Sequence, residues 1–340
     1  MRAALLSEYH QPLEFVERRE PEPRGSRDVV VRVGGAGVCA TDLHAIDGQM
    51  EPAGLTLPVV LGHESAGWVD AVGSDVTAAD IGDAVLVYPA FTCGLCVPCR
   101  SGHDLFCERH QFTGLTRDGG FADYVLVDER SLLPLPAGVE PVDVAPHADA
   151  GITAYHAVKR LSHRLTPGTT AAIIGVGGVG HIALQLARVL GAGAVIAIDT
   201  DERRRKLAHE LGADAVLGEQ ADVADAVREC TDGAGADVVL DFVGTDETHA
   251  AGLAMLARRG LYSIVGFGGV VAHPSVAFVA GEAAITGNLV GNWIDLWELL
   301  ELHSRGDVTL RTETYPLEEV NDVLQALRGG DVTGRAVLVP

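Results

Sequence analysis

The sequence contains few basic residues, and only two of them, Lys159 and Lys206, are lysines. The 25 Lys and Arg residues are outnumbered by 47 Asp and Glu residues, which gives a formal net charge of −22. A surface this acidic repels nucleic acid and anionic membranes, so we expect neither as a partner. The composition suits a soluble protein that acts on an uncharged small molecule.

Long apolar runs are also missing. The longest, at residues 171–179, is broken by glycines, and no run is long enough to span a bilayer. Charged residues interrupt residues 1–20, so they do not read as a secretory signal, and we expect a cytoplasmic protein. Cysteine is scarce too, and six thiols in a reducing compartment are more typical of metal ligands or buried thiols than of disulfides.

The chain changes character at about residue 169. In residues 1–130, short β-branched or aromatic runs are separated by Gly, Pro and Asp, which predicts a β domain. From residue 170 onward, apolar runs alternate with helical segments, which predicts a parallel sheet of about six strands. Strands at residues 170–174 and 194–198 and a helix at residues 249–259 belong to this alternation.

A glycine-rich turn follows the first strand of that second half. Residues 175–180 read Gly-Val-Gly-Gly-Val-Gly and open a helix, which is the context that a dinucleotide-binding turn requires. The helix N-terminus supplies free N–H groups and positive potential for a pyrophosphate. We predict cofactor contacts from Gly175, Gly177, Gly178, Val179 and Gly180. The alternative is a glycine-rich turn that binds nothing.

Asp199 ends the second strand, where an acidic side chain binds the adenosine ribose hydroxyls of a dinucleotide. Its charge would repel the additional phosphate of NADP, so we predict NAD as the cofactor. Arg203, Arg204 and Arg205 follow, and a guanidinium at this place favours that phosphate instead.

Four cysteines, Cys93, Cys96, Cys99 and Cys107, lie within fifteen residues of one another. Four thiolates close a tetrahedral zinc shell with no open position, which is typical of a structural site. An iron–sulfur cluster is the alternative, but the spacing fits a ferredoxin pattern only in part. Cys230 lies on a predicted helix, and we interpret it as a buried thiol with no role.

Cys39 and His63 each have a carboxylate nearby, Asp42 and Glu64 respectively. Taken singly, the two residues read as a buried thiol and a structural imidazole. Together they offer one thiolate and one imidazole, each with a carboxylate that can orient a ligand. A catalytic zinc takes three protein ligands and keeps one position open, so a third ligand is expected.

These motifs, in this order, resemble the zinc-dependent medium-chain dehydrogenase/reductase family, the alcohol dehydrogenases. The resemblance covers essentially the whole chain, from the segment at residues 39–42 and Gly62-His63-Glu64 to Gly334-Arg335. It implies an α/β fold class with a GroES-like β domain and a Rossmann domain built on a doubly wound parallel sheet. The implied domains are residues 1–151, with a structural zinc lobe at 91–110, then residues 152–290 as the NAD-binding Rossmann domain, and residues 291–340 as a return to the catalytic domain.

The family often places its third zinc ligand, a cysteine, in a Cys-Ala-Gly-x-Thr-Ala-Tyr segment. The matching stretch here begins with Asp149 and ends with Tyr155. Either Asp149 binds zinc through oxygen or the site has lost its metal. We favour Asp149 as a ligand beside Cys39 and His63, because aspartate keeps the negative charge of a thiolate and is an accepted zinc donor. With the four-cysteine site, this predicts two zinc ions per chain.

The resemblance also implies roles in a proton relay and in cofactor binding. Thr41 takes the alcohol proton, which passes through the cofactor ribose to His44 and then to water. Glu64 approaches the metal or is a buried, hydrogen-bonded carboxylate. Arg335 lies near the cofactor phosphates, and Arg204 touches the adenosine ribose.

The implied function is hydride transfer between NAD and a secondary or aryl alcohol or ketone. Three alternatives stay open: a polyol or amino-alcohol dehydrogenase of the same family, a zinc-free alkene reductase, against which the metal motifs argue, and a non-catalytic NAD-binding protein. Residues 283–293 resemble the family segment that pairs subunits, so we expect a homodimer or homotetramer.

Overall fold

The structure is a computed structural model that describes residues 1–218 and 222–340. The chain divides into two compact units. Unit 1 comprises Met1–Ile152, Asn292–Gly306 and Leu310–Pro340, and unit 2 comprises Thr153–Gly291 and Asp307–Thr309. In the described part of the chain, no helix is both long enough and apolar enough to cross a membrane.

Unit 1 consists mainly of strands. They are β1 (Arg2–Leu6), β2 (Glu14–Glu17), β3 (Asp28–Val38), β4 (Val59–Val60), β5 (Glu64–Val72), β6 (Ala84–Val87), β7 (Ala90–Phe91), β8 (Gln111–Phe112), β9 (Tyr124–Asp128), β10 (Leu132–Pro134), β17 (Thr312–Pro316) and β18 (Arg335–Val339). The helices are α1 (Ala40–Ile46), α2 (Val97–Arg100), α3 (Pro141–Val144), α10 (Trp293–Ser304) and α11 (Val320–Gly329), with short 3-10 turns η1 (Glu51–Ala53), η2 (Asp104–Phe106), η3 (Glu129–Ser131), η4 (Ala145–Ala148) and η6 (Leu317–Glu319).

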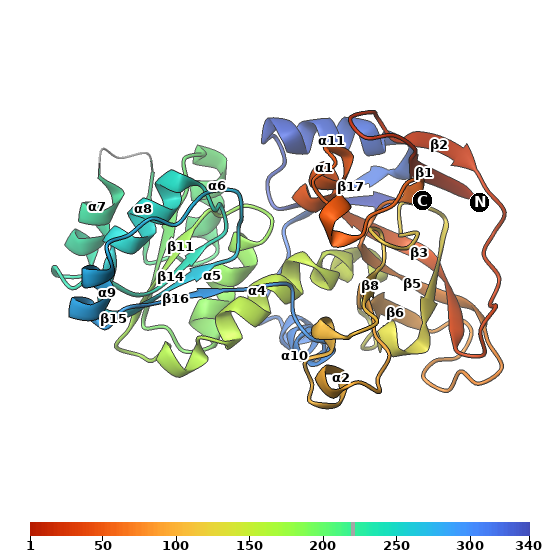
Figure 1. Ribbon diagram of the computed structural model, residues 1–340, viewed down its shortest axis with the longest axis horizontal. Coiled ribbons are helices and arrows are strands. Elements are labelled where there is room, and N and C mark those ends of the chain that lie inside the picture. Colours follow the sequence, from red (N-terminus) through yellow and green to blue (C-terminus); the bar gives the residue numbers. More distant parts are fainter. Residues whose placement is uncertain (219–221) are drawn as a thin grey trace. The chain divides into compact units, whose positions relative to one another are not determined.

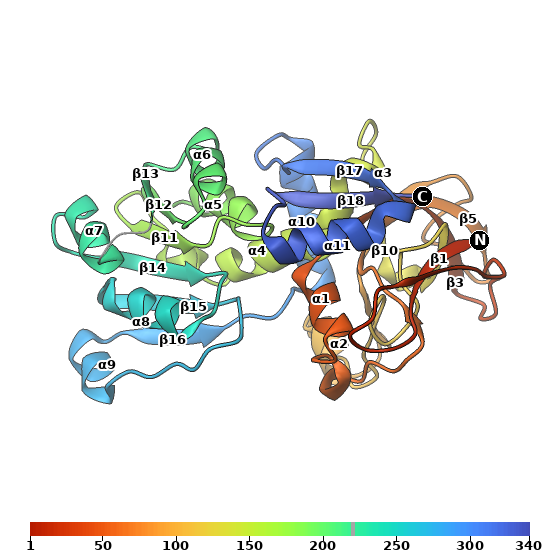
Figure 2. The same ribbon diagram turned by 90° about the horizontal axis from the view of Figure 1, so that it is seen from above.

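The largest sheet of unit 1 has the strand order β10-β6-β5-β3-β18-β17, and β9 also pairs with β3. Strand β3 is central because its valines are buried on both sides, as in Val29, Val30 and Val31. The last strand, β18, runs antiparallel to β3, with Ala336 opposite Val38. Helix α11 lies alongside β17 and β18 (Figure 2). The last strand of the chain therefore completes the sheet that contains β3, while β1 and β2 form a separate three-stranded sheet with β4. The predicted GroES-like domain is confirmed.

Unit 2 contains an all-parallel sheet of strand order β13-β12-β11-β14-β15-β16 (Figure 2). Figure 1 shows its strands β11, β14, β15 and β16 from another side. Its elements are β11 (Thr170–Ile174), α5 (Gly180–Val189), β12 (Ala194–Ile198), α6 (Glu202–Glu210), β13 (Ala215–Leu217), α7 (Val223–Cys230), β14 (Ala236–Asp241), α8 (Asp246–Ala254), β15 (Leu256–Ile264), α9 (Ser275–Gly281) and β16 (Ala284–Gly287), with η5 (Ser162–Arg164) before them. Helix α4 (Ala150–Lys159) begins in unit 1 and continues into unit 2. This order is that of a doubly wound dinucleotide-binding sheet, so the predicted Rossmann fold is confirmed.

Two local predictions are wrong. The helix expected at residues 249–259 ends at Ala254, and β15 begins at Leu256, because apolar residues at positions 253 and 256 fit helical spacing and strand entry equally well. Cys230 is exposed, not buried. It is the last residue of α7, beyond the turn in which Val227 packs into the core.

Candidate metal centres and dinucleotide site

Cys39, His63 and Asp149 converge in unit 1 from three separate segments. Cys39 caps helix α1 at the end of β3, His63 precedes β5, and Asp149 lies between η4 and α4. The Oδ2 atom of Asp149 is 3.5 Å from Cys39 Sγ and 3.4 Å from His63 Nε2. Zinc–ligand bonds of about 2.0–2.3 Å in a tetrahedral shell place neighbouring donors roughly 3.3–3.8 Å apart. Both distances from Asp149 therefore match the spacing that one zinc ion requires, and all three donor atoms lie within 4.8 Å of one another.

Asp42 orients the imidazole of His63. Its Oδ2 accepts a hydrogen bond from the Cys39 backbone N–H at 2.9 Å, and its Oδ1 lies 3.3 Å from His63 Nδ1. Nε2 then faces Cys39 and Asp149. Both ring nitrogens are buried and make no hydrogen bond with the described residues, so the carboxylates lie near them at ion-pair distances only. A carboxylate on one ring nitrogen leaves the other as the metal-binding atom.

The electrostatics of this cluster favour a positive charge at its centre. Burial alone lowers the pKa of His63, but Asp42 and Asp149 more than offset it, so the pKa of His63 lies well above its usual value. Burial alone raises the pKa of Asp149, and His63 reverses that effect and lowers it. An ionised Asp149 and a cation-favouring environment suit a bound metal ion, which would replace the imidazole proton.

Glu64 and Arg335 form a buried ion pair beside these donors. Oε1 of Glu64 accepts from the Arg335 guanidinium and from the Ala150 backbone N–H, the latter at 3.0 Å. Oε2 lies where a side chain at Gly37 would stand: a Cβ there would come within 1.9 Å of it, so only glycine leaves room for this carboxylate. Burial raises the pKa of Glu64, and Arg335 opposes that rise only in part.

Thr41 and His44 lie on α1, three residues apart and thus on one face of the helix. The Thr41 hydroxyl is 3.7 Å from Cys39 Sγ, so it borders the three-donor cluster. His44 is half-buried, and burial lowers its pKa more than Asp47 raises it, which keeps the imidazole neutral and able to accept a proton.

The four cysteines of the lobe lie close together around α2 and η2. Cys96 Sγ is 3.4 Å from Cys99 Sγ, and Cys93 Sγ is 4.0 Å from Cys99 Sγ, against an edge of about 3.8 Å in a tetrahedral zinc–thiolate shell. Backbone N–H groups of Leu95 and Cys96 point at Cys93 Sγ and lower its pKa to about 6. Such donors stabilise thiolates, the form that binds metal.

The glycine turn in unit 2 joins β11 to α5. Gly175 has a φ of +86°, and Gly180 packs so closely that a Cβ would come within 1.8 Å of the Gly175 carbonyl oxygen. No atom lies within 4 Å of the Cβ position at Gly177, so the backbone of the turn, which continues through Gly178 and Val179, is open to a ligand on that side. The N-terminus of α5 follows at once, where free N–H groups suit a phosphate.

Asp199, which follows β12, holds this turn in place through hydrogen bonds. It is buried, and its carboxylate accepts from the Val176 backbone N–H at 2.7 Å and from the Asp201 backbone N–H at 2.9 Å. Of the neighbouring arginines, Arg203 pairs with Asp201, and Arg205 donates to the Asp199 and Thr200 carbonyl oxygens. Arg204 lies in the first turn of α6. The guanidiniums of Arg203 and Arg205 are therefore engaged close to their own position in the chain.

One part of this site was missed from the sequence. At the end of β14, Asp241 accepts from the Val243 backbone N–H at 2.8 Å and from the Tyr262 hydroxyl at 2.6 Å. Because Tyr262 donates its hydrogen to Asp241, His249 must donate to Tyr262 from Nδ1, across 2.6 Å. The loop so held packs on the turn, since Val243 occupies the space beside Gly175. The local signal for Asp241 is an acidic residue that ends a buried strand three residues before a glycine, Gly244.

Comparisons with known proteins agree with this geometry. The family described as alcohol dehydrogenase GroES-like domain matches residues 25–137, and the zinc-binding dehydrogenase family matches residues 178–305. An NAD-dependent alcohol dehydrogenase of Sulfurisphaera tokodaii is 35% identical to this chain, and the match covers 100% of both chains. The D-arabinose 1-dehydrogenase (NADP(+)) of Saccharolobus solfataricus is 33% identical, over 100% of this chain and 97% of its own length.

Among solved structures, the alcohol dehydrogenase of Aeropyrum pernix superposes with a TM-score of 0.96 at 44% identity, covering 100% of both chains. Fold, sites and matches together define a zinc-binding, dinucleotide-dependent dehydrogenase: the chain belongs to the zinc-dependent medium-chain dehydrogenase/reductase family. The relatives named NAD-dependent alcohol dehydrogenase agree with the enzyme class predicted from the sequence.

Proposed function

We propose that the enzyme transfers hydride between NAD and a secondary or aryl alcohol or its ketone, at a zinc ion held by Cys39, His63 and Asp149. The observation that carries this proposal is the spacing of the three donors, with Asp149 at 3.5 Å from the thiol sulfur and 3.4 Å from the imidazole nitrogen. A zinc ion in this place would act as a Lewis acid on the substrate oxygen, with NAD as the hydride acceptor.

In this proposal, residues of the chain itself transfer the proton of the substrate. The Thr41 hydroxyl borders the metal ligands, and it accepts the proton of the substrate hydroxyl while it releases its own proton. His44, kept neutral by its lowered pKa, is the group that receives the relayed proton and passes it to solvent. Glu64 is buried against the donor cluster and carries one carboxylate oxygen with no hydrogen-bond partner among the described residues. We propose that this oxygen approaches the metal when substrate and water exchange.

The second proposed zinc, held by Cys93, Cys96, Cys99 and Cys107, is structural because four protein ligands leave no position for a substrate. The short distances among the four sulfur atoms, and the backbone N–H groups that point at Cys93 Sγ, support this structural zinc site.

For NAD, the proposal assigns the pyrophosphate to the N-terminus of α5 and the adenosine ribose hydroxyls to Asp199. Arg204 would contact the ribose, and Arg335 the phosphates, in addition to its ion pair with Glu64. A carboxylate at position 199 disfavours a 2′-phosphate, which supports NAD over NADP.

Two observations bear on the substrate. Phe112 packs near His63, with ring centroids 6.1 Å apart, and Leu115 is buried close by in sequence, which supports an apolar substrate. The rival reading, a polyol substrate, is favoured by the D-arabinose 1-dehydrogenase among the relatives. A non-catalytic NAD-binding protein is the remaining alternative, and it predicts bound cofactor without turnover.

We also propose a cytoplasmic homodimer or homotetramer. Strand β16 ends the sheet of unit 2, its residue Ile285 is 38% exposed, and Leu289 just beyond it is 59% exposed. An exposed edge strand with apolar side chains invites pairing with a second copy.

An assay panel tests the proposed reaction. Purified enzyme is given NADH or NADPH with acetophenone and 2-butanone, and NAD or NADP with D-arabinose. We expect NADH oxidation by both ketones at a kcat/KM at least about tenfold above that of any sugar reaction, since unpaired hydroxyls are poorly accepted by an apolar pocket. Preference for D-arabinose would establish the rival, and binding of NADH without turnover of any substrate would establish the non-catalytic alternative.

A further inference from the structure

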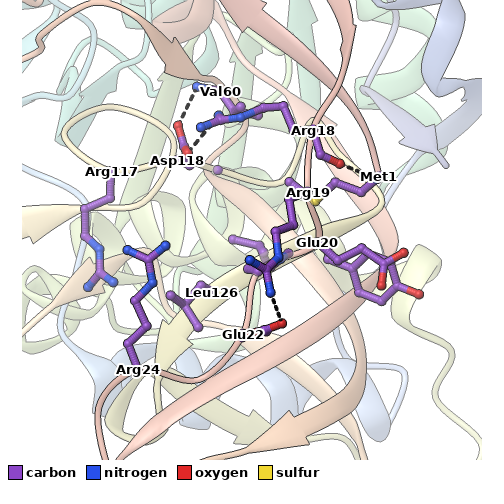
Figure 3. A pocket seen from close by; sticks show the side chains of 14 residues that line it. Met1, Arg18, Arg19, Glu20, Glu22, Arg24, Val60, Arg117, Asp118 and Leu126 are labelled. Carbon is purple, nitrogen blue, oxygen red and sulfur yellow. Dashed lines mark hydrogen bonds and ion pairs between the residues drawn. The ribbon is translucent and has the colours of Figure 1, made fainter.

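Unit 1 contains a pocket of about 590 Å³ that plays no part in the proposed reaction. Its walls come from the segment between β2 and β3, the loop that follows β8, and strand β9 (Figure 3). Four arginines line it, namely Arg18, Arg19, Arg24 and Arg117. In a chain of net charge −22, such a concentration of guanidinium groups calls for a physical reason. We call this site the arginine pocket.

Two of the four arginines are already neutralised. Arg18 donates to Asp118 at 2.9 Å, and the other oxygen of Asp118 accepts from the Val60 backbone N–H at 3.0 Å. Arg19 pairs with Glu22 at 2.6 Å. These pairs build the wall of the pocket and leave their guanidiniums little capacity for a ligand.

Arg24 and Arg117 are different, because neither makes an ion pair with any residue that the structure describes. Figure 3 shows both side chains extending into the same end of the pocket, with their guanidinium groups pointing toward one another. Glu20, the remaining carboxylate of the lining, lies toward the other end. Two cations that face each other without an anion repel, and a ligand anion between them removes that repulsion.

Arg117 is held in place by an aromatic ring, whereas only the backbone of Arg24 is anchored. The guanidinium of Arg117 lies over the Phe91 ring, 4.6 Å from its centroid, which limits its movement. The backbone N–H of Arg24 donates to Asp28 at 3.0 Å, and the exposed side chain extends from that anchored segment. A guanidinium whose orientation is fixed before binding loses less conformational entropy when it binds a ligand, and Arg117 supplies this advantage.

We propose that the arginine pocket binds a small phosphate monoester, with its phosphate between Arg24 and Arg117. Each guanidinium can donate two parallel N–H bonds, and the three terminal oxygens of a phosphate accept four such bonds better than the two oxygens of a carboxylate. The organic part would rest on Val60 and Leu126, the apolar part of the lining. The volume lies within the range of about 300–1,000 Å³ usual for small-molecule sites.

Isothermal titration calorimetry of the full chain, loaded with zinc and saturated with NAD, tests this proposal. Saturating NAD blocks the phosphate-binding turn of unit 2, so that added phosphate reports on other sites. The probes are phenyl phosphate, which carries no alcohol that the enzyme could oxidise, and inorganic phosphate, both at constant ionic strength. The variants are Arg24→Gln combined with Arg117→Gln, and the matched control Arg19→Gln, which changes a lining arginine that is already paired with Glu22.

We expect one saturable site per chain, with phenyl phosphate bound more tightly than inorganic phosphate. The double variant should lose at least about tenfold in affinity, since losing one charge-assisted hydrogen bond weakens binding by roughly that factor. The affinity of the control should stay within about twofold of the parent protein, because a surface ion pair contributes little. The alcohol dehydrogenase activity of all three proteins should be equal, because the arginine pocket plays no part in the proposed reaction. Absence of saturable binding, or equal affinity in the double variant, would overturn the proposal. Binding of inorganic phosphate without phenyl phosphate would reassign the pocket to the free ion and overturn the monoester.

Discussion

At the scale of single residues, the central feature is the carboxylate at position 149. Its oxygen lies at tetrahedral-edge distances from a thiol and an imidazole, which supports our proposal that it is the third zinc ligand. The surrounding groups keep it ionised, because His63 lowers the pKa of Asp149 in spite of burial. An oxygen donor is harder than sulfur but remains within the set that zinc accepts.

Thr41 gives the first prediction. Replacing it by Val removes the hydroxyl beside Cys39 and should lower kcat by about 10²–10⁴-fold, the usual contribution of a positioned proton-transfer group. Steady-state ketone reduction measures it, together with zinc content, which should not change. Thr41→Ser keeps the hydroxyl and should retain most of the rate. Equal loss in both variants would remove the hydroxyl from the mechanism.

Asp199 gives the second prediction. Asp199→Gly removes the charge that repels a 2′-phosphate, so the ratio of kcat/KM with NADPH to that with NADH should rise at least about tenfold. The change also removes the acceptor of the Val176 N–H, at 2.7 Å in the structure. Asp199→Asn controls for this loss, because the amide oxygen still accepts that bond. If neither variant alters the ratio, Asp199 does not select the cofactor.

At the scale of elements, buried hydrogen bonds join Asp241 on β14 to Tyr262 on β15, and Asp241 also holds the loop that follows β14. Tyr262→Phe should leave Asp241 and His249 without a shared partner and lower the stability of unit 2 by about 1–3 kcal/mol. Thermal unfolding and steady-state kinetics measure the effect: the melting temperature should fall, and the KM for NADH should rise. Tyr9→Phe, a change at a half-buried tyrosine of unit 1, serves as the control. An unchanged melting temperature would show that the chain of bonds is not structural.

The elements of unit 2 were more predictable from the sequence than those of unit 1. Strands β11 and β12 have the predicted bounds, because apolar residues bounded by glycine or aspartate leave little choice. The boundary between α8 and β15 was missed, because hydrophobic spacing cannot separate a helix from a strand that follows it directly. The glycine turn and the four cysteines were visible as short local motifs.

Other parts of the sites could not be found in this way. The hydrogen bonds among Asp241, Tyr262 and His249 join residues from different elements, and no local pattern reveals them. The partner of Glu64 is likewise Arg335, from the opposite end of the chain, and it is brought there by the pairing of β18 with β3. Long-range contacts of this kind depend on sheet topology.

At the scale of the whole molecule, the net charge of −22 and the exposed edge of β16 act in opposite directions on assembly. We expect the apolar edge to prevail and to give a homodimer or homotetramer, since charge repulsion is screened at physiological salt. Ile285→Lys places a charge on that edge and should shift the mass from light scattering to that of a single chain. Ile81→Lys changes an exposed residue of unit 1 and should not. A monomeric parent protein would contradict the assembly.

The most direct test of the account is the zinc content of the chain with and without Asp149. Inductively coupled plasma mass spectrometry of the purified protein should find two zinc ions per chain, and of Asp149→Ala one, with an unchanged far-UV circular dichroism spectrum. Cys93→Ser tests the other site, and its zinc loss should come with loss of stability because that metal only holds the lobe together. A single zinc in the unaltered protein, or two in Asp149→Ala, would contradict the assignment of Asp149 as a catalytic zinc ligand.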